Sequence, residues 1–216
     1  MDEREEIILF CRGKEINLSL ESFQNDSKVK IFSSKEGFTY DGSTKDGKAH
    51  GDGMFSSNGE SWDGSWEEGI FKKGRLSSPG TNLVGSFNTQ GELNGHGTEY
   101  SGAKRVAYTG MFSNGQKEGR GTIFHENGRI KYNGEFRAGV REGYGEEYND
   151  NETLVYSGGF KKDQRHGFGS YYSQGQLRYA GQHYKGQQCG FGVVFHKVFF
   201  FNFAPSDFHS RDFLYF

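Results

Sequence analysis

Proline and cysteine are both scarce in this sequence, and it contains no long apolar run. Only 2 of its 216 residues are proline and 2 are cysteine. Cys11 and Cys189 lie far apart and lack metal-site spacing, which favours two reduced thiols over a disulfide or metal scaffold. No stretch approaches the ~20 apolar residues that span a bilayer, and the apolar run at 7–11 is too short for a signal peptide. These absences predict a soluble, cytoplasmic protein.

Positive charge is not in excess either. The 26 Lys and Arg are matched by 28 Asp and Glu, giving a net charge of −2. This balance provides no general attraction to nucleic acid. Hydrophobic residues make up only 32% of the chain, whereas aromatic residues alone reach 16%. We therefore expect a thin structure in which aromatic rings do most of the packing.

Glycine is abundant, at 34 residues, and it recurs with a fixed period. From residue 108 to 195 one pattern recurs four times: a tyrosine, a glycine two residues later and then a Gly-x-Gly pair, with a phenylalanine two residues after the first glycine in the first three copies and a single turn glycine in all but the third. The start-to-start spacings are 24, 24 and 23 residues, a period typical of a repeat array. The copies begin at Tyr108, Tyr132, Tyr156 and Tyr179.

Three less regular units precede these four, so the array covers residues 38–195. The first begins at Tyr40. The second begins at Trp62 and loses its glycine pair, because Lys73 and Arg75 occupy those offsets. The third begins at Leu83 and carries one extra residue before its glycine pair. We expect these second and third units to be degenerate.

The pattern within each unit predicts a β-hairpin. Alternate residues of a strand share a face, so Tyr132, Gly134 and Phe136 lie together. Glycine leaves bare backbone there, which an aromatic ring from the neighbouring strand can cover. Gly139 provides the positive φ that a hairpin turn needs. The sequence thus predicts an all-β fold: an elongated single-layer twisted antiparallel sheet of about seven hairpins, ~65 Å long for ~14 strands at ~4.8 Å.

Residues 1–37 lack the repeat, and we interpret them as an N-terminal β cap. Ile16, Leu18 and Leu20 alternate with polar residues, as in a half-exposed strand, and residues 7–11 and 29–32 predict two more strands. A cap would protect the edge of an open sheet. A short helix over 18–24 is the alternative. Residues 196–216 form an aromatic C-terminal tail, and terminal caps thus flank the array.

No catalytic or metal-binding motif is present. No two of the seven histidines lie three or four residues apart, and no carboxylate or cysteine cluster joins them. There is no Gly-x-Ser-x-Gly elbow, and no Gly-x-Gly pair opens an evident helix in a βαβ unit. We therefore expect no enzyme activity, no catalytic residue, no metal and no cofactor.

The position between the paired glycines points away from the glycine face and changes along the chain. It is polar at Asp52, His96 and Arg120 and then aromatic. Contiguous apolar surface is usually covered or used for binding. If the hairpins stack in register, Tyr144, Phe168 and Phe191 form an aromatic stripe on this face. We consider two hypotheses: the C-terminal tail folds back as a cap on the sheet, or the stripe and the tail together dock a helix or a second copy of the chain. The candidate protein-binding residues are Tyr144, Phe168, Phe191, Phe199, Phe201 and Phe203.

The spacing Tyr-x-Gly-x-Phe, Gly, Gly-x-Gly over 38–195 resembles the MORN (membrane occupation and recognition nexus) repeat family. His50 and His166 also match the His-Gly-x-Gly motif that is common in this family. The chain departs from the pattern at Leu83 and Asp163, besides the second unit's missing pair. The resemblance implies an elongated grooved sheet. It also implies a non-enzymatic protein of the kind found in cytoskeletal and ciliary scaffolds, at membrane junctions, or beside an attached enzyme.

Three functions follow as hypotheses. The first is a scaffold or adaptor that binds another protein, such as a helix in its groove, in a cytoskeletal or ciliary assembly, with a homodimer through the C-terminal end as a variant. The second is a peripheral membrane module for acidic phospholipids, which the interleaved glutamates weaken. The third is a targeting or regulatory partner of an enzyme on another chain. The candidate lipid-binding residues are Lys131, Arg137, Arg141, Lys161, Lys162, Arg165 and Lys185.

Overall fold

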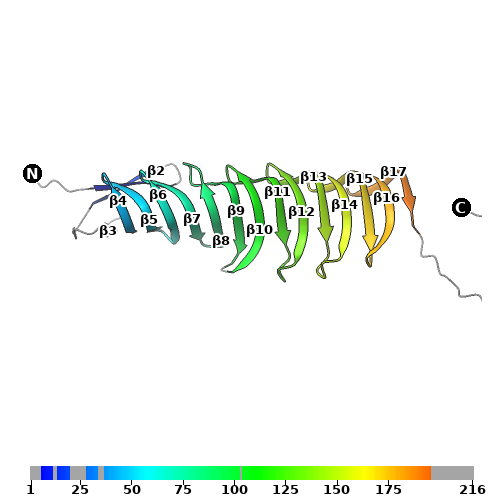
Figure 1. Cartoon of the computed structure of the whole chain (residues 1–216), viewed down its shortest axis with the longest axis horizontal. Coiled ribbons are helices and arrows are strands. Elements are labelled where there is room, and N and C mark those ends of the chain that lie inside the picture. The colour runs from blue at the N-terminus through cyan, green and yellow to red at the C-terminus, as the bar shows by residue number, and fades with distance from the viewer. Residues whose placement is uncertain (1–5, 12–13, 20–27, 34–36, 103, 196–216) are drawn as a thin grey trace, which may run out of the picture.

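The computed structural model describes residues 6–11, 14–19, 28–33, 37–102 and 104–195. In these ranges the chain forms 17 strands and no helix. Figure 1 shows one long sheet with the strands side by side across its axis. The strands are β1 (Glu6–Cys11), β2 (Lys14–Ser19), β3 (Lys28–Ser33), β4 (Phe38–Lys45), β5 (Lys48–Ser57), β6 (Glu60–Glu67), β7 (Ile70–Ser78), β8 (Thr81–Phe87), β9 (Leu93–Ser101), β10 (Arg105–Ser113), β11 (Gln116–Phe124), β12 (Ile130–Arg137), β13 (Val140–Tyr148), β14 (Leu154–Lys161), β15 (Gln164–Ser173), β16 (Gln176–Tyr184) and β17 (Gln187–Val194).

From β3 to β17 each strand pairs antiparallel with the next, so the array is an open meander of hairpins. This confirms the predicted all-β single-layer sheet. The three strands expected within residues 1–37 are also present. Leu18 lies in β2 rather than in a helix, and residues 20–24 of the alternative helix lie outside the described ranges.

The hairpin of β1 and β2 runs across the first hairpins of the array instead of extending the sheet. In β1, Ile8 pairs parallel with Lys48 of β5, and Phe10 pairs with Ile70 of β7. Lys48 and Ile70 are each the first residue of a strand and directly follow a hairpin turn. β1 therefore crosses the first two hairpins along the long edge of the sheet that carries these turns, called here the turn edge (Figure 1). Ile16 of β2 packs against the aromatic core. Only this end of the array carries such a crossing hairpin within the described residues.

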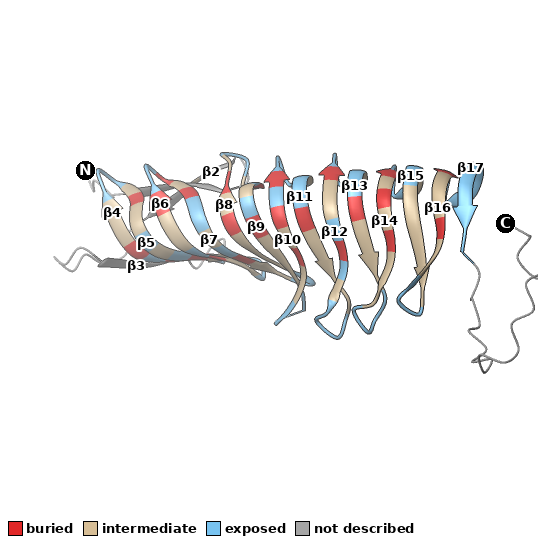
Figure 2. Ribbon diagram, turned by 45° about the vertical axis from the view of Figure 1, so that its right-hand side comes forward, coloured by how far each residue is buried: buried red, intermediate tan, exposed pale blue. Residues whose placement is uncertain are grey.

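The core is a continuous row of buried side chains along one face, called here the aromatic face, and in the regular repeats it is a single file of rings. Tyr108 contacts Phe112 of its own repeat and Phe136 of the next, with centroids 5.1 and 5.2 Å apart and the rings edge to face. Tyr132 repeats the arrangement with Phe136 and Phe160 at 5.3 and 5.1 Å. Edge-to-face pairs add to the energy of burial. The ladder therefore joins neighbouring hairpins that are only marginally stable alone. Figure 2 shows buried residues in red on successive strands.

Each regular repeat places its first tyrosine over a pair of glycines. Gly134 of β12 pairs with Gly145 of β13, and the Tyr132 ring lies across both. A Cβ atom on Gly145 would overlap that ring. The Tyr132 hydroxyl donates to the Glu135 carbonyl oxygen at 3.1 Å, which satisfies it beside the bare backbone. The predicted covering of glycine by an aromatic ring is confirmed, and the ring covers its own strand as well as the neighbouring one.

The second repeat lacks the Gly-x-Gly pair, as the sequence indicates, but it still pairs two glycines across its strands. Gly74, which lies between Lys73 and Arg75, pairs with Gly64. The register of this hairpin differs by one residue from that of the regular units, and the ring of Phe71 on the second strand lies against Gly74. Cross-strand pairing, rather than the Gly-x-Gly offsets, therefore decides which glycines meet.

The third repeat also forms a hairpin, with an aliphatic cover in place of an aromatic one. Gly85 pairs with Gly97, and Leu93 of β9 lies against both. Leu93 is 1% exposed and Leu83 packs at the margin of the core. The extra residue is accommodated in the loop between β8 and β9.

The turns of successive hairpins are hydrogen-bonded to one another. The second turn residue donates its N–H to a carbonyl oxygen of the preceding hairpin: Gly139 to Lys117 at 3.0 Å and Asp163 to Arg141 at 3.1 Å. Asp163 replaces the turn glycine with φ of 64°, a left-handed conformation that aspartate tolerates. The departure at Asp163 therefore does not interrupt the array.

Candidate functional site

The face opposite the aromatic ladder, called here the outer face, carries three exposed rings at the position between the paired glycines near the C-terminal end of the array. Tyr144 of β13 is 56% exposed, Phe168 of β15 70% and Phe191 of β17 86%. Each follows a glycine at which the pairing shifts register, as at Gly143 with φ of 97°. Such a bulge re-aims a side chain. The structure therefore brings together the three stripe residues that the sequence singled out.

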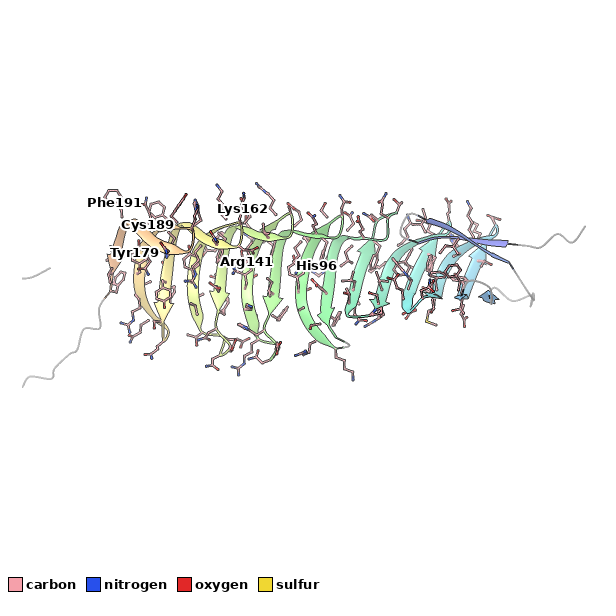
Figure 3. All side chains as sticks on the ribbon, turned by 180° about the vertical axis from the view of Figure 1, so that it is seen from behind. His96, Arg141, Lys162, Tyr179, Cys189 and Phe191 are labelled. Atoms are coloured by element: carbon pink, nitrogen blue, oxygen red, sulfur yellow. The ribbon has the colours of Figure 1, made fainter. Side chains whose placement is uncertain are left out.

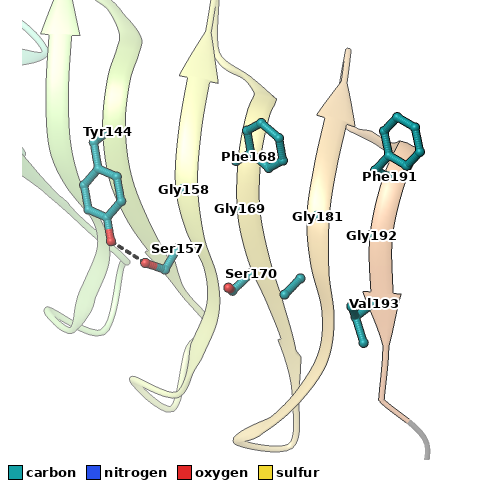
Figure 4. Close-up of a pocket in the computed structure, with 11 residues that line it drawn as sticks. Tyr144, Ser157, Gly158, Phe168, Gly169, Ser170, Gly181, Phe191, Gly192 and Val193 are labelled. Carbon is teal, nitrogen blue, oxygen red and sulfur yellow. Dashed lines mark hydrogen bonds between the residues drawn. The ribbon is translucent and has the colours of Figure 1, made fainter. Parts of the chain in front are cut away.

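The three rings border an open groove of about 770 Å³. Its floor is made of small residues on β14 to β17, so the rings stand above nearly bare backbone (Figure 4). The Tyr144 hydroxyl is 2.5 Å from the Ser157 hydroxyl, which fixes the ring at one end. The floor residues are Ser157, Gly158, Gly169, Ser170, Ala180, Gly181, Gly192 and Val193.

The groove is confined to the last three hairpins. The equivalent positions of earlier repeats hold His96 and Arg120, both exposed and polar. β17 is exposed along its whole length, as the uniformly pale-blue strand in Figure 2 shows, so the groove opens onto the end of the described sheet. An apolar surface in this position is accessible to a ligand or partner.

Four of the seven candidate lipid-binding cations lie at the turn edge beside the groove. Arg137 ends β12, Lys161 ends β14, and Lys162 and Lys185 sit in the turns that follow β14 and β16. All four are exposed, and within the described ranges none of them forms an ion pair. Figure 3 shows Lys162 and Phe191 toward the same long edge of the sheet.

Arg141 and Arg165 lie instead on the aromatic face, so the seven cations do not form one basic face. The Arg141 guanidinium is 5.3 Å from the Tyr132 ring centroid and 3.2 Å from the Asp163 carboxylate. Arg165 lies 2.6 Å from Glu147, which also pairs with Arg141 at 3.5 Å. Both cations thus pack over rings of the tyrosine ladder and stabilise it.

Lys131 also stands apart from the groove. It is exposed near the start of β12, at the opposite end of that strand from Arg137. The seven candidate lipid-binding residues therefore do not share one face, because strand alternation and strand length separate their side chains.

Glu118 and Glu142, which the sequence placed simply among interleaved charges, hold the turns. The Glu118 carboxylate accepts a hydrogen bond from the Ala138 N–H at 3.0 Å, and Glu142 accepts one from the Lys162 N–H at 3.1 Å. Each donor is a turn residue of the next hairpin. The signal in the sequence was the repeated acidic residue just before the glycine pair.

In the described residues no group of three or more His, Cys, Asp or Glu could hold a metal ion, and no helix is long and apolar enough to cross a membrane. Burial raises the pKa of Tyr108, Tyr132 and Tyr156 to about 12, so these hydroxyls remain protonated donors in the ladder. Phe199, Phe201 and Phe203 lie outside the described residues, and their role in docking remains a prediction.

A second hollow of about 570 Å³ lies at the third repeat, which sequence reasoning did not identify. Leu76, Leu83, Leu93 and Phe112 line it, with Glu92 and Glu99 among its other residues. Leucine at position 83 is smaller than the tyrosine or tryptophan of other repeats, and this substitution was the available signal.

Comparison with known families gives one result. The model of the MORN repeat matches three consecutive segments, residues 108–128, 132–153 and 156–177. These segments coincide with the regular hairpins that begin at Tyr108, Tyr132 and Tyr156. No curated protein matches the chain.

Proposed function

Because the chain is a MORN-repeat protein, we propose that it is a non-catalytic docking module that binds another protein along the outer-face groove. MORN repeats are generally associated with protein or membrane-lipid interactions, and the fold is a non-enzymatic repeat type. The observation that carries the proposal is the row of Tyr144, Phe168 and Phe191, three large rings that are exposed at the same position of the last three hairpins.

The spacing of the rings defines the shape of the partner. They stand on alternate strands, so neighbouring rings are ~10 Å apart along the sheet axis, twice the strand separation. A linear segment laid along that axis places one apolar side chain in each interval. The small residues of the floor, such as Ser170 and Ala180, leave room for those side chains. A helix or an extended segment of another protein fits this geometry.

The charge beside the groove defines the chemistry of the partner. Arg137, Lys161, Lys162 and Lys185 are exposed and without ion pairs in the described part of the chain. A partner with carboxylates on one flank of its apolar side chains complements this edge and gains in association rate and register. The proposed ligand is thus an apolar segment with acidic residues along one side.

A cytoskeletal or ciliary scaffold is the setting that we propose for this docking. An elongated sheet holds a partner at a defined distance from whatever binds its other end, which suits a scaffold. The membrane alternative is supported by the same exposed cations and rings. We favour the protein partner because a hollow bordered by rings fits a ridge of side chains better than a flat bilayer.

The test is selection of peptides from a displayed random library on the purified full chain. We expect acidic segments with spaced apolar residues. A variant with Phe168→Asp and Phe191→Asp should bind them at least tenfold more weakly, because aromatic anchors dominate such interfaces. The matched control is His96→Asp with Arg120→Asp, at the same position of earlier repeats, which should bind like wild type. Equal binding by the two double variants would refute the proposal.

Vesicles of phosphatidylcholine and phosphatidylserine test the membrane alternative. Salt-sensitive sedimentation of the wild-type chain with these vesicles, together with failure to select any peptide, would replace the protein partner with a lipid surface. Circular dichroism and thermal unfolding of each variant show whether the sheet is intact, so that loss of binding is not confused with loss of fold.

A further inference from the structure

The last hairpin carries a histidine where the aromatic ladder otherwise has phenylalanine. The fifth position of the regular repeats is Phe112, Phe136 and Phe160, and in the last it is His183. The imidazole is 3% exposed. It lies edge to face between Tyr156 and Tyr179, with centroids 5.0 and 5.2 Å away. His183 therefore fills the space of a phenylalanine and joins β14 to the terminal hairpin.

The Nδ1 atom of His183 is buried and has no hydrogen-bond partner, the only such side-chain atom among the described residues. A buried polar atom without a partner costs free energy, and a buried charge without one costs far more. A neutral imidazole is tolerated in this ring-lined space. An imidazolium would place a proton and a charge where no acceptor is available to Nδ1.

Among the described residues, the neighbours of His183 provide no anion in contact with it. Tyr156 faces it from β14, Arg165 lies nearby on β15, and Tyr179 faces it from its own strand β16. The carboxylate of Glu147 on β13 is already shared by Arg165 and Arg141. β17 contains no charged residue, and its ionisable group is the exposed thiol of Cys189.

Burial is the main cause that lowers the pKa of His183 below its usual 6.5, and the positive charge of Arg165 acts in the same direction. A backbone hydrogen bond at Gly181 acts against them. The folded hairpin therefore resists protonation more than the opened one does. Stability is fully present above about pH 6.5 and is lost as the pH falls toward the lowered pKa of the closed state.

In the part of the chain that the structure describes, the terminal hairpin is paired with the rest of the array on one side only. β16 pairs with β15, but β17 pairs only with β16 within the described residues, and all of β17 is exposed. Local opening is easiest where few buried contacts hold an element. Tyr179 and His183 are the only buried side chains of this hairpin, so the histidine is one of the two side chains by which it joins the ladder.

We propose that His183 is a proton-controlled lock on the terminal hairpin: protonation below about pH 6.5 releases β16 and β17 from the ladder. Phe191 and Val193 lie on β17, so release removes one ring and part of the floor of the outer-face groove. The opening itself stands without the proposed function. Its consequence, weaker partner binding at acidic pH, rests on that function.

The test is hydrogen exchange of the full-length chain from pH 7.5 to 5, with rates corrected for the intrinsic pH dependence of amide exchange. Protection of β16 and β17 should fall by up to about tenfold per pH unit below pH 6.5, the limit for one proton. Amides of β10 to β13, whose ladder positions hold Phe112 and Phe136, should change far less. Unchanged or rising protection of β16 and β17 at acidic pH would overturn the proposal.

His183→Phe restores the ring of the other repeats and should remove the pH dependence while keeping the hairpin closed. His166→Gln is the matched control, since His166 lies 5.4 Å from the Tyr184 ring on the outer face, and it should keep the wild-type response. A His183→Phe chain whose terminal hairpin still opens at acidic pH would assign the effect to another group. Peptide binding that is lost at pH 5.5 in wild type but kept in His183→Phe would link the lock to the groove. If the hairpin opens at acidic pH while peptide binding is unaffected, the result would contradict binding in the outer-face groove and not the proposed role of His183.

Discussion

The second and third hairpins and the four regular hairpins bury the same feature in different ways. All of them pair two glycines across adjacent strands. In the regular repeats a tyrosine on the first strand covers the pair, as Tyr132 covers Gly134 and Gly145. In the second and third the cover comes from the second strand, as Phe71 or Leu93. The glycine pair is thus the constant of the fold, and its cover is interchangeable provided that a bulky apolar group reaches it.

The two regions also differ in how their rings are arranged and in what lies over them. Around the second repeat, Trp62, Trp66, Phe71 and Phe87 contact one another at 5.0 to 5.9 Å in a compact cluster. In the regular repeats the rings form a single file with cations over them, such as Lys117 at 4.8 Å from the Tyr108 ring. A cluster shares its burial among several neighbours. A single file depends on every member, which makes the C-terminal half easier to break at one residue.

The largest effect should come from removing one ring of the file. Tyr132→Ala deletes a fully buried ring with two ring partners, and we expect a loss of about 3–5 kcal/mol of unfolding free energy by analogy with other large aromatic deletions. Tyr144→Ala, which removes a 56% exposed tyrosine, should cost less than about 1 kcal/mol. Urea unfolding followed by circular dichroism compares the two. Similar costs would mean that the ladder does not hold the array.

A smaller effect should come from the glycine pair itself. Gly145→Ala drives a methyl group into the Tyr132 ring and should cost about 1–3 kcal/mol. In a Tyr132→Leu background, which imitates the cover of the third repeat, the added cost should be smaller because the ring is gone. A double-mutant cycle in urea measures this coupling. Strictly additive costs would show that the ring and the glycine are independent.

The smallest effect should come from the ion pairs of the file. Glu147→Gln removes the carboxylate shared by Arg141 and Arg165, whose side chains are 20% and 24% exposed, and should cost about 1 kcal/mol. Glu126→Gln alters an exposed pair with Arg105 at 3.9 Å and should be neutral within about 0.5 kcal/mol. Thermal unfolding at low and high salt distinguishes them. If Glu147→Gln does not change the stability, the rings and not the ion pairs support the C-terminal half of the array.

Much of this architecture followed from the pattern of residues. The period of Tyr, Gly and Phe determined hairpins, their order and the buried face, because strand alternation and positive φ turns are local properties. The same alternation placed Tyr144, Phe168 and Phe191 on the outer face. The pairing of Gly64 with Gly74 could not be predicted, since a shift of register by one residue depends on which neighbours pack best.

The sequence by itself determined a repeat that buries one face and leaves the other free to vary. Only the tertiary structure decided how individual polar groups are used. It turned Arg141 and Arg165 onto the tyrosine file, gave Glu118 and Glu142 to the turns of the next hairpin, and enclosed His183 without a partner for Nδ1. Period and alternation act within a few residues, whereas the contacts of Glu118 and Glu142 join residues 20 apart that meet only when hairpins stack, and the two arginines reach their tyrosines only once the two strands of a hairpin pair.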